Sequence, residues 1–257
     1  MSSTETLTRQ PRVTVAGVSK QFGEVTALTD VDLVLGDREF VSVVGASGCG
    51  KSTLLSIIAG LEAPTTGSAS IAGAEILGPG RDRGVVFQQA TLLPWLSALD
   101  NVVFALDGEQ GLSKRDRVER AREALAQVGL TGFEQAYPAQ LSGGMQQRVA
   151  LARSLAYGPS VLLMDEPFGA LDALTRRTMQ ELLTQVWERN RMTVMLITHD
   201  IEEAVFLSDR VVAMTPRPGK VAAEYAIELP RPRTPDVIGN DAFREYYRDI
   251  LDLIHRG

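Results

Sequence analysis

Cysteine is nearly absent from this sequence: Cys49 is the single one in 257 residues. An internal disulfide is therefore excluded, and the composition fits a reducing compartment. Aromatic residues are also scarce, at 6% of the chain. No run of about 18 apolar residues occurs, so no stretch is typical of a membrane-spanning helix.

The sequence also lacks an excess of positive charge. With 26 Lys and Arg against 32 Asp and Glu, the formal net charge is −6. This balance argues against a protein that binds nucleic acid through bulk positive charge, and we expect no nucleic-acid partner. The first residues, MSSTETLTRQP, are polar and lack the apolar segment of a signal peptide. We expect residues 1–11 to form a disordered tail.

What the chain does contain is a series of short apolar runs. Unbroken runs rich in β-branched residues predict strands that are buried on both faces, as in a parallel sheet. The predicted strands span 40–45, 84–88, 160–166, 193–200 and 210–214. Three of them end in polar residues, namely a glycine-rich loop, Asp-Glu and His-Asp. Because ligands of open α/β sheets bind at the carboxyl ends of the strands, we expect the chemistry at that edge.

A long stretch without strand signal, residues 92–158, predicts a helical insertion in this α/β core. Ser113 followed by Asp116 resembles a capping box, and apolar residues then recur at helical spacing until Gly129. A second predicted helix follows the letters SGG of the segment SGGMQQR and ends at Gly158.

The last part of the chain changes pattern. Residues 221–229 alternate between apolar and polar, which predicts a half-buried edge strand that runs antiparallel to its neighbour. The segment PRPRTP then interrupts regular structure. From Phe243 to Ile254 apolar residues recur at the spacing of an amphipathic helix. We therefore divide the chain into a core domain, 12–229, and a C-terminal linker with an amphipathic helix, 230–257.

The segment GASGCGKST matches the pattern G-x-x-x-x-G-K-[ST] of a phosphate-binding loop. It follows a predicted strand and opens a predicted helix, which is the context that the pattern requires. The glycines let backbone N–H groups converge on phosphate oxygens, Lys51 reaches the β- and γ-phosphates, and the Ser52 hydroxyl binds Mg²⁺. The loop comprises Gly45, Ala46, Ser47, Gly48, Cys49, Gly50, Lys51, Ser52 and Thr53.

The segment VLLMDEP supplies two carboxylates at the end of a buried strand. Asp165 is placed to hold Mg²⁺ and, together with Lys51 and Ser52, predicts a Mg²⁺-nucleotide site. Glu166 follows one residue later and points another way, so it is the candidate base that orients and deprotonates an attacking water. These residues do not specify the base of the nucleotide.

The segment LSGGMQQR lies between these two motifs and resembles the signature motif of ATP-binding-cassette (ABC) ATPases. Four further positions match the adenine-stacking aromatic, the Q-loop glutamine, the D-loop aspartate and the switch histidine of that family, and these are Phe22, Gln88, Asp172 and His199. The resemblance implies ATP and Mg²⁺ as ligands, with Gln88 on the metal and the water and His199 on the γ-phosphate. It implies an α/β P-loop NTPase fold, which has a RecA-like core with a mainly parallel sheet, an antiparallel β edge subdomain and a helical insertion. The core domain, 12–229, is then the ABC ATPase domain.

Each matched position also has a plain structural interpretation. Phe22 could be a core residue, Gln88 a strand-end amide, and His199 a surface residue. Ser142, taken alone, is typical of a helix N-cap. The chain also departs from the family at two positions: Phe22 stands where tyrosine is usual, and Met145 where glutamine is usual. Because Met145 removes a polar contact, we expect somewhat weaker ATP affinity.

In this family two ATPase domains pack head to tail, and each ATP is clamped between the phosphate loop of one chain and the signature helix of the other. The resemblance therefore implies a homodimer. Ser142, Gly143 and Gly144 would form part of the site for the ATP held by the second copy, with the helix N-terminus favouring the γ-phosphate.

A single cassette resembles the separate ATPase subunit of a bacterial importer. The segments GPGRDRGVVFQ, LLPW, DEPFGALDALTR and THDIEEAVFLSDRV are similar to the nitrate, sulfonate and taurine branch, and most similar to taurine-type subunits. This implies a membrane permease and, indirectly, a periplasmic substrate-binding protein as partners. It also implies a peripheral position on the cytoplasmic face of the bacterial inner membrane. The apolar loop from Leu92 to Leu96 is expected to receive the permease, unless Trp95 packs inside the insertion.

Three other function classes fit less well. Cassette ATPases that act on DNA or ribosomes have two cassettes in one chain or a long coiled-coil insertion, and this sequence has neither. A P-loop GTPase would carry a guanine-reading Asn-Lys-x-Asp, which is absent, and a kinase would leave the SGG segment unexplained. A nucleotide-dependent assembly factor with little turnover would not need Glu166.

Overall fold

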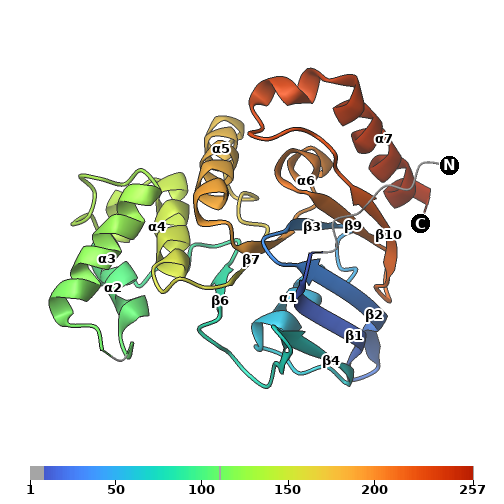
Figure 1. Ribbon diagram of the computed structural model, residues 1–257, viewed down its shortest axis with the longest axis horizontal. Helices are drawn as coiled ribbons and strands as arrows, with labels where there is room; N and C mark the ends of the chain where they lie inside the picture. Colours follow the sequence, from blue (N-terminus) through green and yellow to red (C-terminus); the bar gives the residue numbers. More distant parts are fainter. Residues whose placement is uncertain (1–8, 110, 257) are drawn as a thin grey trace.

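The computed structural model describes residues 9–109 and 111–256, in which two sheets enclose a helix (Figure 1). The larger sheet has the strand order β10-β9-β3-β8-β7-β6. Its strands are β3 (Phe40–Val44), β6 (Arg83–Val86), β7 (Val161–Asp165), β8 (Thr193–Ile197), β9 (Arg210–Met214) and β10 (Val221–Ala226). Neighbouring strands run parallel except for β9 and β10, which are antiparallel. The predicted core strands and the mainly parallel sheet are therefore confirmed.

The smaller sheet is antiparallel, with the order β2-β1-β4-β5. Its strands are β1 (Pro11–Phe22), β2 (Val25–Gly36), β4 (Thr66–Ile71) and β5 (Ala74–Glu75). It is the antiparallel subdomain that the family resemblance implied, although none of its strands was predicted individually. The prediction of a disordered tail over residues 1–11 is wrong at its C-terminal end, because Pro11 is the first residue of β1 and pairs with Gly36. Residues 1–8 of that tail lie outside the described residues.

Strand β3 shows why the core strands are unbroken apolar runs rather than alternations of apolar and polar residues. Phe40 and Val44 pack into one hydrophobic core with the helices, whereas Val41 and Val43 pack into a second core between the two sheets. Ser42 is buried in the same strand, and its hydroxyl hydrogen-bonds to that of Ser208. A strand with apolar partners on both faces has no solvent face that would need polar residues.

Helices cover both faces of the larger sheet (Figure 1). Helix α1 (Lys51–Ala59) lies between the two sheets and contributes to the second core. Helices α5 (Ala173–Asn190), α6 (Ile201–Leu207) and α7 (Asp241–Arg256) pack into the first core. There the ring of Trp187 in α5 meets the ring of Phe40 edge-on, with centroids 5.8 Å apart. This contact fixes α5 against the central strand β3.

The helical insertion lies between β6 and β7 and forms one end of the molecule (Figure 1). It consists of α2 (Ala98–Leu106), α3 (Lys114–Gln127), the short 3₁₀ helix η1 (Pro138–Gln140) and α4 (Gly143–Leu155). The predicted capping box is confirmed, since the Asp116 N–H donates to Ser113 Oγ and the Ser113 N–H donates to Asp116 Oδ2, both at 3.2 Å. Trp95 is 69% exposed, so the alternative in which it packs inside the insertion is wrong.

The C-terminal part closes the first core. Strand β10 is the antiparallel edge strand that was predicted, but it ends at Ala226 rather than at residue 229. Beyond the 3₁₀ helix η2 (Pro235–Gly239), α7 buries Phe243 and Ile250, as its amphipathic pattern predicted. Among the described residues, no helix is both long enough and apolar enough to cross a bilayer.

Candidate nucleotide-binding site

The candidate residues gather at the carboxyl ends of the parallel strands. The phosphate loop follows β3, and Gln88 follows β6. Asp165 ends β7, Glu166 comes directly after it, and His199 follows β8. Because these strands are parallel and adjacent, their ends share one edge of the sheet, as the sequence predicted.

Glycine is required at two positions of the phosphate loop. Gly50, immediately before α1, has a φ of 102°, and a Cβ there would lie 2.6 Å from Leu28 Cδ2. A Cβ at Gly45 would lie 2.9 Å from Met214 O. The loop is therefore wedged between β2 and the end of β9, with no room for side chains at these points. Cys49 is buried within this packing.

Lys51 is the first residue of α1, and its side chain turns back over the loop. Its Nζ donates to Gly45 O at 2.8 Å and to Ala46 O at 3.0 Å. Among the described residues, its hydrogen-bond partners are these carbonyls and the Cys49 sulfur, and no carboxylate. A cation held by uncharged groups at a helix N-terminus suits an anionic ligand such as a phosphate chain.

A cavity of about 300 Å³ opens beside the loop. The predicted residues that line it are Phe22, Ser47, Gly48, Gly50, Lys51, Ser52, Thr53 and Glu166. Phe22 is 46% exposed, so the alternative in which it is a core residue is wrong, and its ring is accessible to a nucleobase. Val25, Ala27 and Arg217 also line the cavity, and the sequence did not single them out.

Ser52, which lines this cavity, is paired with Asp165 at the end of β7. The Ser52 hydroxyl donates to Asp165 Oδ1 at 3.0 Å. Burial raises the pKa of Asp165, and the hydrogen bond from Ser52 opposes that rise. A hydroxyl beside a partly buried carboxylate is a set of oxygen donors of the kind that Mg²⁺ prefers. The residues present therefore fit the metal ion that the family implies.

Gln88, the third predicted metal ligand, is exposed beyond the end of β6. A Cβ placed on Gly169 would lie 3.1 Å from Gln88 Nε2 and 3.6 Å from Glu166 Oε2. The Gln88 amide and the Glu166 carboxylate, the candidate base, therefore both lie close to Gly169.

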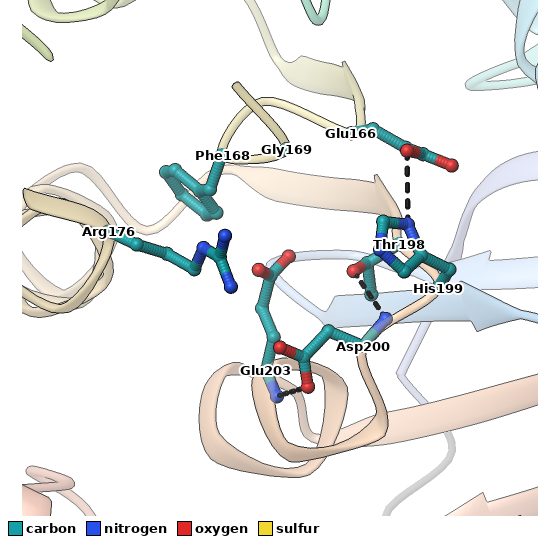
Figure 2. Close-up of a pocket in the computed structure, with 8 residues that line it drawn as sticks. All are labelled: Glu166, Phe168, Gly169, Arg176, Thr198, His199, Asp200 and Glu203. Atoms are coloured by element: carbon teal, nitrogen blue, oxygen red, sulfur yellow. Dashed lines mark hydrogen bonds and ion pairs between the residues drawn. The ribbon is translucent and has the colours of Figure 1, made fainter. Parts of the chain in front are cut away.

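Glu166 and His199 are in direct contact. Glu166 leaves β7 with a φ of 44°, and its N–H donates to Ile197 O at 2.9 Å. Its Oε2 lies 3.1 Å from His199 Nδ1 (Figure 2). A left-handed conformation at a non-glycine residue costs roughly 1–3 kcal/mol and is concentrated at functional sites. His199 is therefore more than an isolated surface residue, since it holds the candidate base.

Behind this pair lies a small cavity of about 20 Å³, enough for one water molecule (Figure 2). Glu203 of α6 is buried there and accepts a hydrogen bond from Gln180 Nε2 at 3.3 Å. The guanidinium of Arg176 points towards the Glu203 carboxylate in Figure 2. Burial, followed by the charge of Asp200, raises the pKa of Glu203 to about 8. The sequence did not single out Glu203, because adjacent glutamates at a helix start are usually exposed.

The second glycine segment lies elsewhere. Ser142 is the N-cap of α4, and its Oγ accepts from the Met145 N–H at 3.3 Å, so its capping interpretation is confirmed. Ser142 and Gly143 are exposed, whereas Gly144 faces α5, where a Cβ would lie 2.4 Å from Thr175 Cγ2. Ser142, Gly144 and Met145 line a cavity between α4 and α5 that is separate from the one at the phosphate loop. The phosphate loop and the N-terminus of α4 therefore line two separate cavities of the chain.

Asp172 is the N-cap of α5. Its Oδ1 accepts from the N–H groups of Leu174 and Thr175 at 3.1 and 3.0 Å. The hydrogen bond from the Thr175 hydroxyl is the main cause that lowers the pKa of Asp172. The structure thus gives this residue a capping role, and its D-loop role stays a prediction.

A buried glutamine connects α4 to the Q-loop. Gln147 is buried, and its Nε2 donates to Phe87 O at 2.9 Å. Phe87 immediately precedes Gln88, so the signature helix is tied to the segment that carries a predicted metal ligand. The sequence did not single out Gln147, because a glutamine between Gln146 and Arg148 carries no sign of burial.

Known proteins share these features. A family model described as "ABC transporter" matches residues 28–169. The taurine import ATP-binding protein TauB of Burkholderia thailandensis is 51% identical over 220 residues, which is 86% of this chain and 84% of that protein. The nitrate import ATP-binding protein NrtD of Synechocystis sp. is 48% identical over 238 residues, which is 90% of this chain and 89% of that protein.

A solved structure supports the same assignment. The dimeric post-hydrolysis state of the ATP-binding cassette MJ0796, bound to ADP and Pi, has a TM-score of 0.74 and 38% identity to this chain. The similarity covers 84% of this chain and 99% of that one. The predicted fold class is thereby confirmed. With the phosphate loop, the strand-end carboxylates and the signature helix all in place, this chain belongs to the ABC transporter family as one of its ATPase domains.

Proposed function

We propose that this chain is the ATP-hydrolysing subunit of a bacterial ABC importer. The observation that carries the proposal is the convergence of the phosphate loop, Ser52 and Glu166 around one cavity, with Asp165 bonded to the Ser52 hydroxyl. The two relatives described above are named as import ATP-binding proteins, which supports import rather than another use of ATP.

The site residues divide the reaction between them. Lys51 and the loop N–H groups bind the β- and γ-phosphates of ATP. Ser52, Asp165 and Gln88 would hold Mg²⁺, which neutralises phosphate charge when bound. Glu166 accepts a proton from water as the water oxygen bonds to the γ-phosphorus and the bond to the ADP oxygen breaks. His199 holds the Glu166 carboxylate and donates to the γ-phosphate.

A complete site takes two copies of the chain. The exposed N-terminus of α4 would bind ATP from the other side, so that the partner subunit's Ser142, Gly143 and Gly144 meet the γ-phosphate. ATP then favours the closed dimer because both copies contact it, and hydrolysis removes that preference. The dimeric state of the solved relative supports this arrangement.

The dimer would drive a separate membrane permease from the cytoplasmic face, with a periplasmic substrate-binding protein as an indirect partner. The exposed Trp95 and the neighbouring apolar loop offer a surface for that permease. The proposed cargo is taurine or another aliphatic sulfonate. Nitrate is the alternative, because the nitrate relative is nearly as similar to this chain as the taurine relative.

The test is the ATPase activity of Lys51→Ala. Without the ammonium the β- and γ-phosphates lose a charge-assisted contact, and we expect turnover to fall at least about 100-fold. Arg244→Ala, which changes an exposed cation of α7, is the matched control and should hydrolyse ATP normally. Near-normal hydrolysis by Lys51→Ala would remove the basis of the proposed function.

A further inference from the structure

The turn between β9 and β10 reaches the phosphate loop. It has the sequence TPRPGK, residues 215–220. The Gly219 N–H donates to Ala27 O at 2.9 Å, and the Thr29 N–H donates to Gly219 O at 3.1 Å. These two bonds attach the turn to β2, which belongs to the other sheet. The turn is therefore held from both sides, by its own hairpin and by β2.

The same turn lies directly against the phosphate loop. A Cβ at Gly219 would lie only 2.0 Å from Cys49 O, so the two backbones touch and no larger residue fits there. Pro216 and Pro218 stand on either side of Arg217 and restrict the backbone φ at both positions. These restraints fix the backbone at Arg217 and therefore the point from which its side chain extends.

Arg217 extends from this turn over the loop. Its Nε donates to Gly48 O at 3.2 Å, and the residue lines the same cavity as Phe22 and Lys51. Arg217 is exposed, and among the described residues its side-chain hydrogen bond goes to this carbonyl and not to a carboxylate. In a chain with a net charge of −6, a guanidinium that lines this cavity without a carboxylate partner is available to bind an anionic ligand.

The geometry points to Arg217 as a further nucleotide-binding residue, whose guanidinium contacts the phosphate chain of ATP from the side of the β9–β10 turn. This inference rests on the proposed ATP site. The phosphate chain is the part of the nucleotide that Arg217 would meet, because Gly48 belongs to the loop whose N–H groups surround phosphate oxygens. A guanidinium presents several N–H donors in one plane and matches phosphate oxygens better than an ammonium does. Phe22 offers its ring to the base instead.

The test compares the binding of ATP, ADP and AMP to Arg217→Ala and to the unchanged chain, by competition with a fluorescent nucleotide. Loss of one charge-assisted contact should weaken ATP binding about tenfold, weaken ADP binding less, and leave AMP binding nearly unchanged. Arg217→Lys keeps the charge and should recover part of the affinity. In steady-state hydrolysis, KM should rise more than kcat falls. Arg244→Ala is the control for an exposed arginine outside the cavity.

Each other outcome has a distinct meaning. If Arg217→Ala binds ATP as the unchanged chain does, while Lys51→Ala binds it weakly, Arg217 is not a ligand and the proposed site stands. If ATP and AMP are weakened equally, Arg217 contacts the ribose or the base, and the phosphate assignment is wrong. If Lys51→Ala also binds ATP normally, the proposed site itself fails. Thermal unfolding of Arg217→Ala, compared with that of the unchanged chain, separates lost binding from lost folding.

Discussion

Each candidate site residue at the end of β7 is held by a contact with a residue that is distant in sequence. Asp165 is fixed by Ser52, and Glu166 by His199. Both contacts join residues that are far apart along the chain, since Ser52 lies in the first turn of α1 and His199 follows β8. In the proposed function the two adjacent carboxylates serve different roles, one towards a metal ion and one towards an attacking water.

Replacement of Glu166 by glutamine tests its role as the base. Glutamine keeps the shape of the side chain but cannot accept the proton from water, so hydrolysis should fall at least about 100-fold while ATP still binds. We expect Glu166→Gln to form an ATP-dependent dimer that persists during size-exclusion chromatography. A variant that stays monomeric with ATP would show either that Glu166 is not the base or that ATP does not close a dimer.

Glu203 gives a pH-dependence of stability with a definite sign. Folding raises the pKa of this carboxyl from 4.5 to about 8, so the folded chain retains a proton that the unfolded chain releases. This group therefore destabilises the fold increasingly as the pH rises from about 4.5 towards 8. The groups that face it are Thr198, Asp200, Gln180 and Arg176.

The Glu203→Gln variant has no carboxyl that can ionise. We therefore expect its free energy of unfolding, relative to that of the parent chain, to be higher at pH 8 than at pH 5, by a few kcal/mol at most. Urea denaturation at both pH values measures the difference in free energy of unfolding. Glu245→Gln, on the exposed face of α7, is the control and should show no such change. If Glu203→Gln and the parent chain differ in free energy of unfolding by the same amount at both pH values, the Glu203 carboxyl is ionised in the folded chain.

At the scale of elements, α4 connects two segments that the proposed site would use. Its exposed N-terminus carries Ser142, and one turn later Gln147 donates to the backbone just before Gln88. A movement of the helical insertion relative to the sheet would therefore move the Q-loop. At Gly144, α4 packs so closely on α5 that a Cβ would lie 2.4 Å from Thr175 Cγ2.

Gln147→Ala should separate this link from nucleotide binding. The change leaves the buried Phe87 carbonyl without its donor and should lower the free energy of unfolding by about 1–3 kcal/mol. Since Gln147 lies outside the cavity at the phosphate loop, the affinity for ATP should stay within about twofold, while kcat falls more than KM changes. Ser113→Ala, which removes the cap of α3 at a cost of about 1 kcal/mol, controls for a merely destabilising change in the insertion. Equal kcat in the two variants would contradict a coupling role.

At the scale of the whole molecule, the proposed composite ATP site needs a second copy of the chain. The phosphate loop lies between the sheets, whereas Ser142 lies at the helical insertion, and each half lines its own cavity. Since both halves are present in each chain, a two-fold symmetric dimer satisfies both sites at once.

Mixing two inactive variants tests this arrangement. In a heterodimer of Lys51→Ala and Ser142→Arg chains, both lesions fall in the same composite site and the other site is intact. We expect each variant alone to be inactive and the mixture to recover activity, up to about half of the normal activity in heterodimers if the two sites act independently. Titration of one variant against the other, with ATPase activity as the readout, measures the recovery. No recovery at any ratio, in chains shown to mix, would contradict completion in trans or independence of the two sites, and full activity would contradict trans completion.

The sequence by itself determined the features that depend on neighbours along the chain. The phosphate loop, the continuous core strands and the capping box at Ser113 follow from local residue chemistry. The strands of the smaller sheet escaped prediction because β1 pairs with register shifts on both of its edges, which break the alternation that marks a strand.

Tertiary structure alone decided the features that depend on distant partners. Glu203 is buried where α6 meets Gln180 of α5, and Gln147 is buried where α4 meets Phe87. The position of Arg217 comes from β2 and the phosphate loop. None of these contacts joins residues that are close in sequence, so no local pattern records them. The physical reason is that burial and charge environment are properties of the space around a side chain, and folding sets that space.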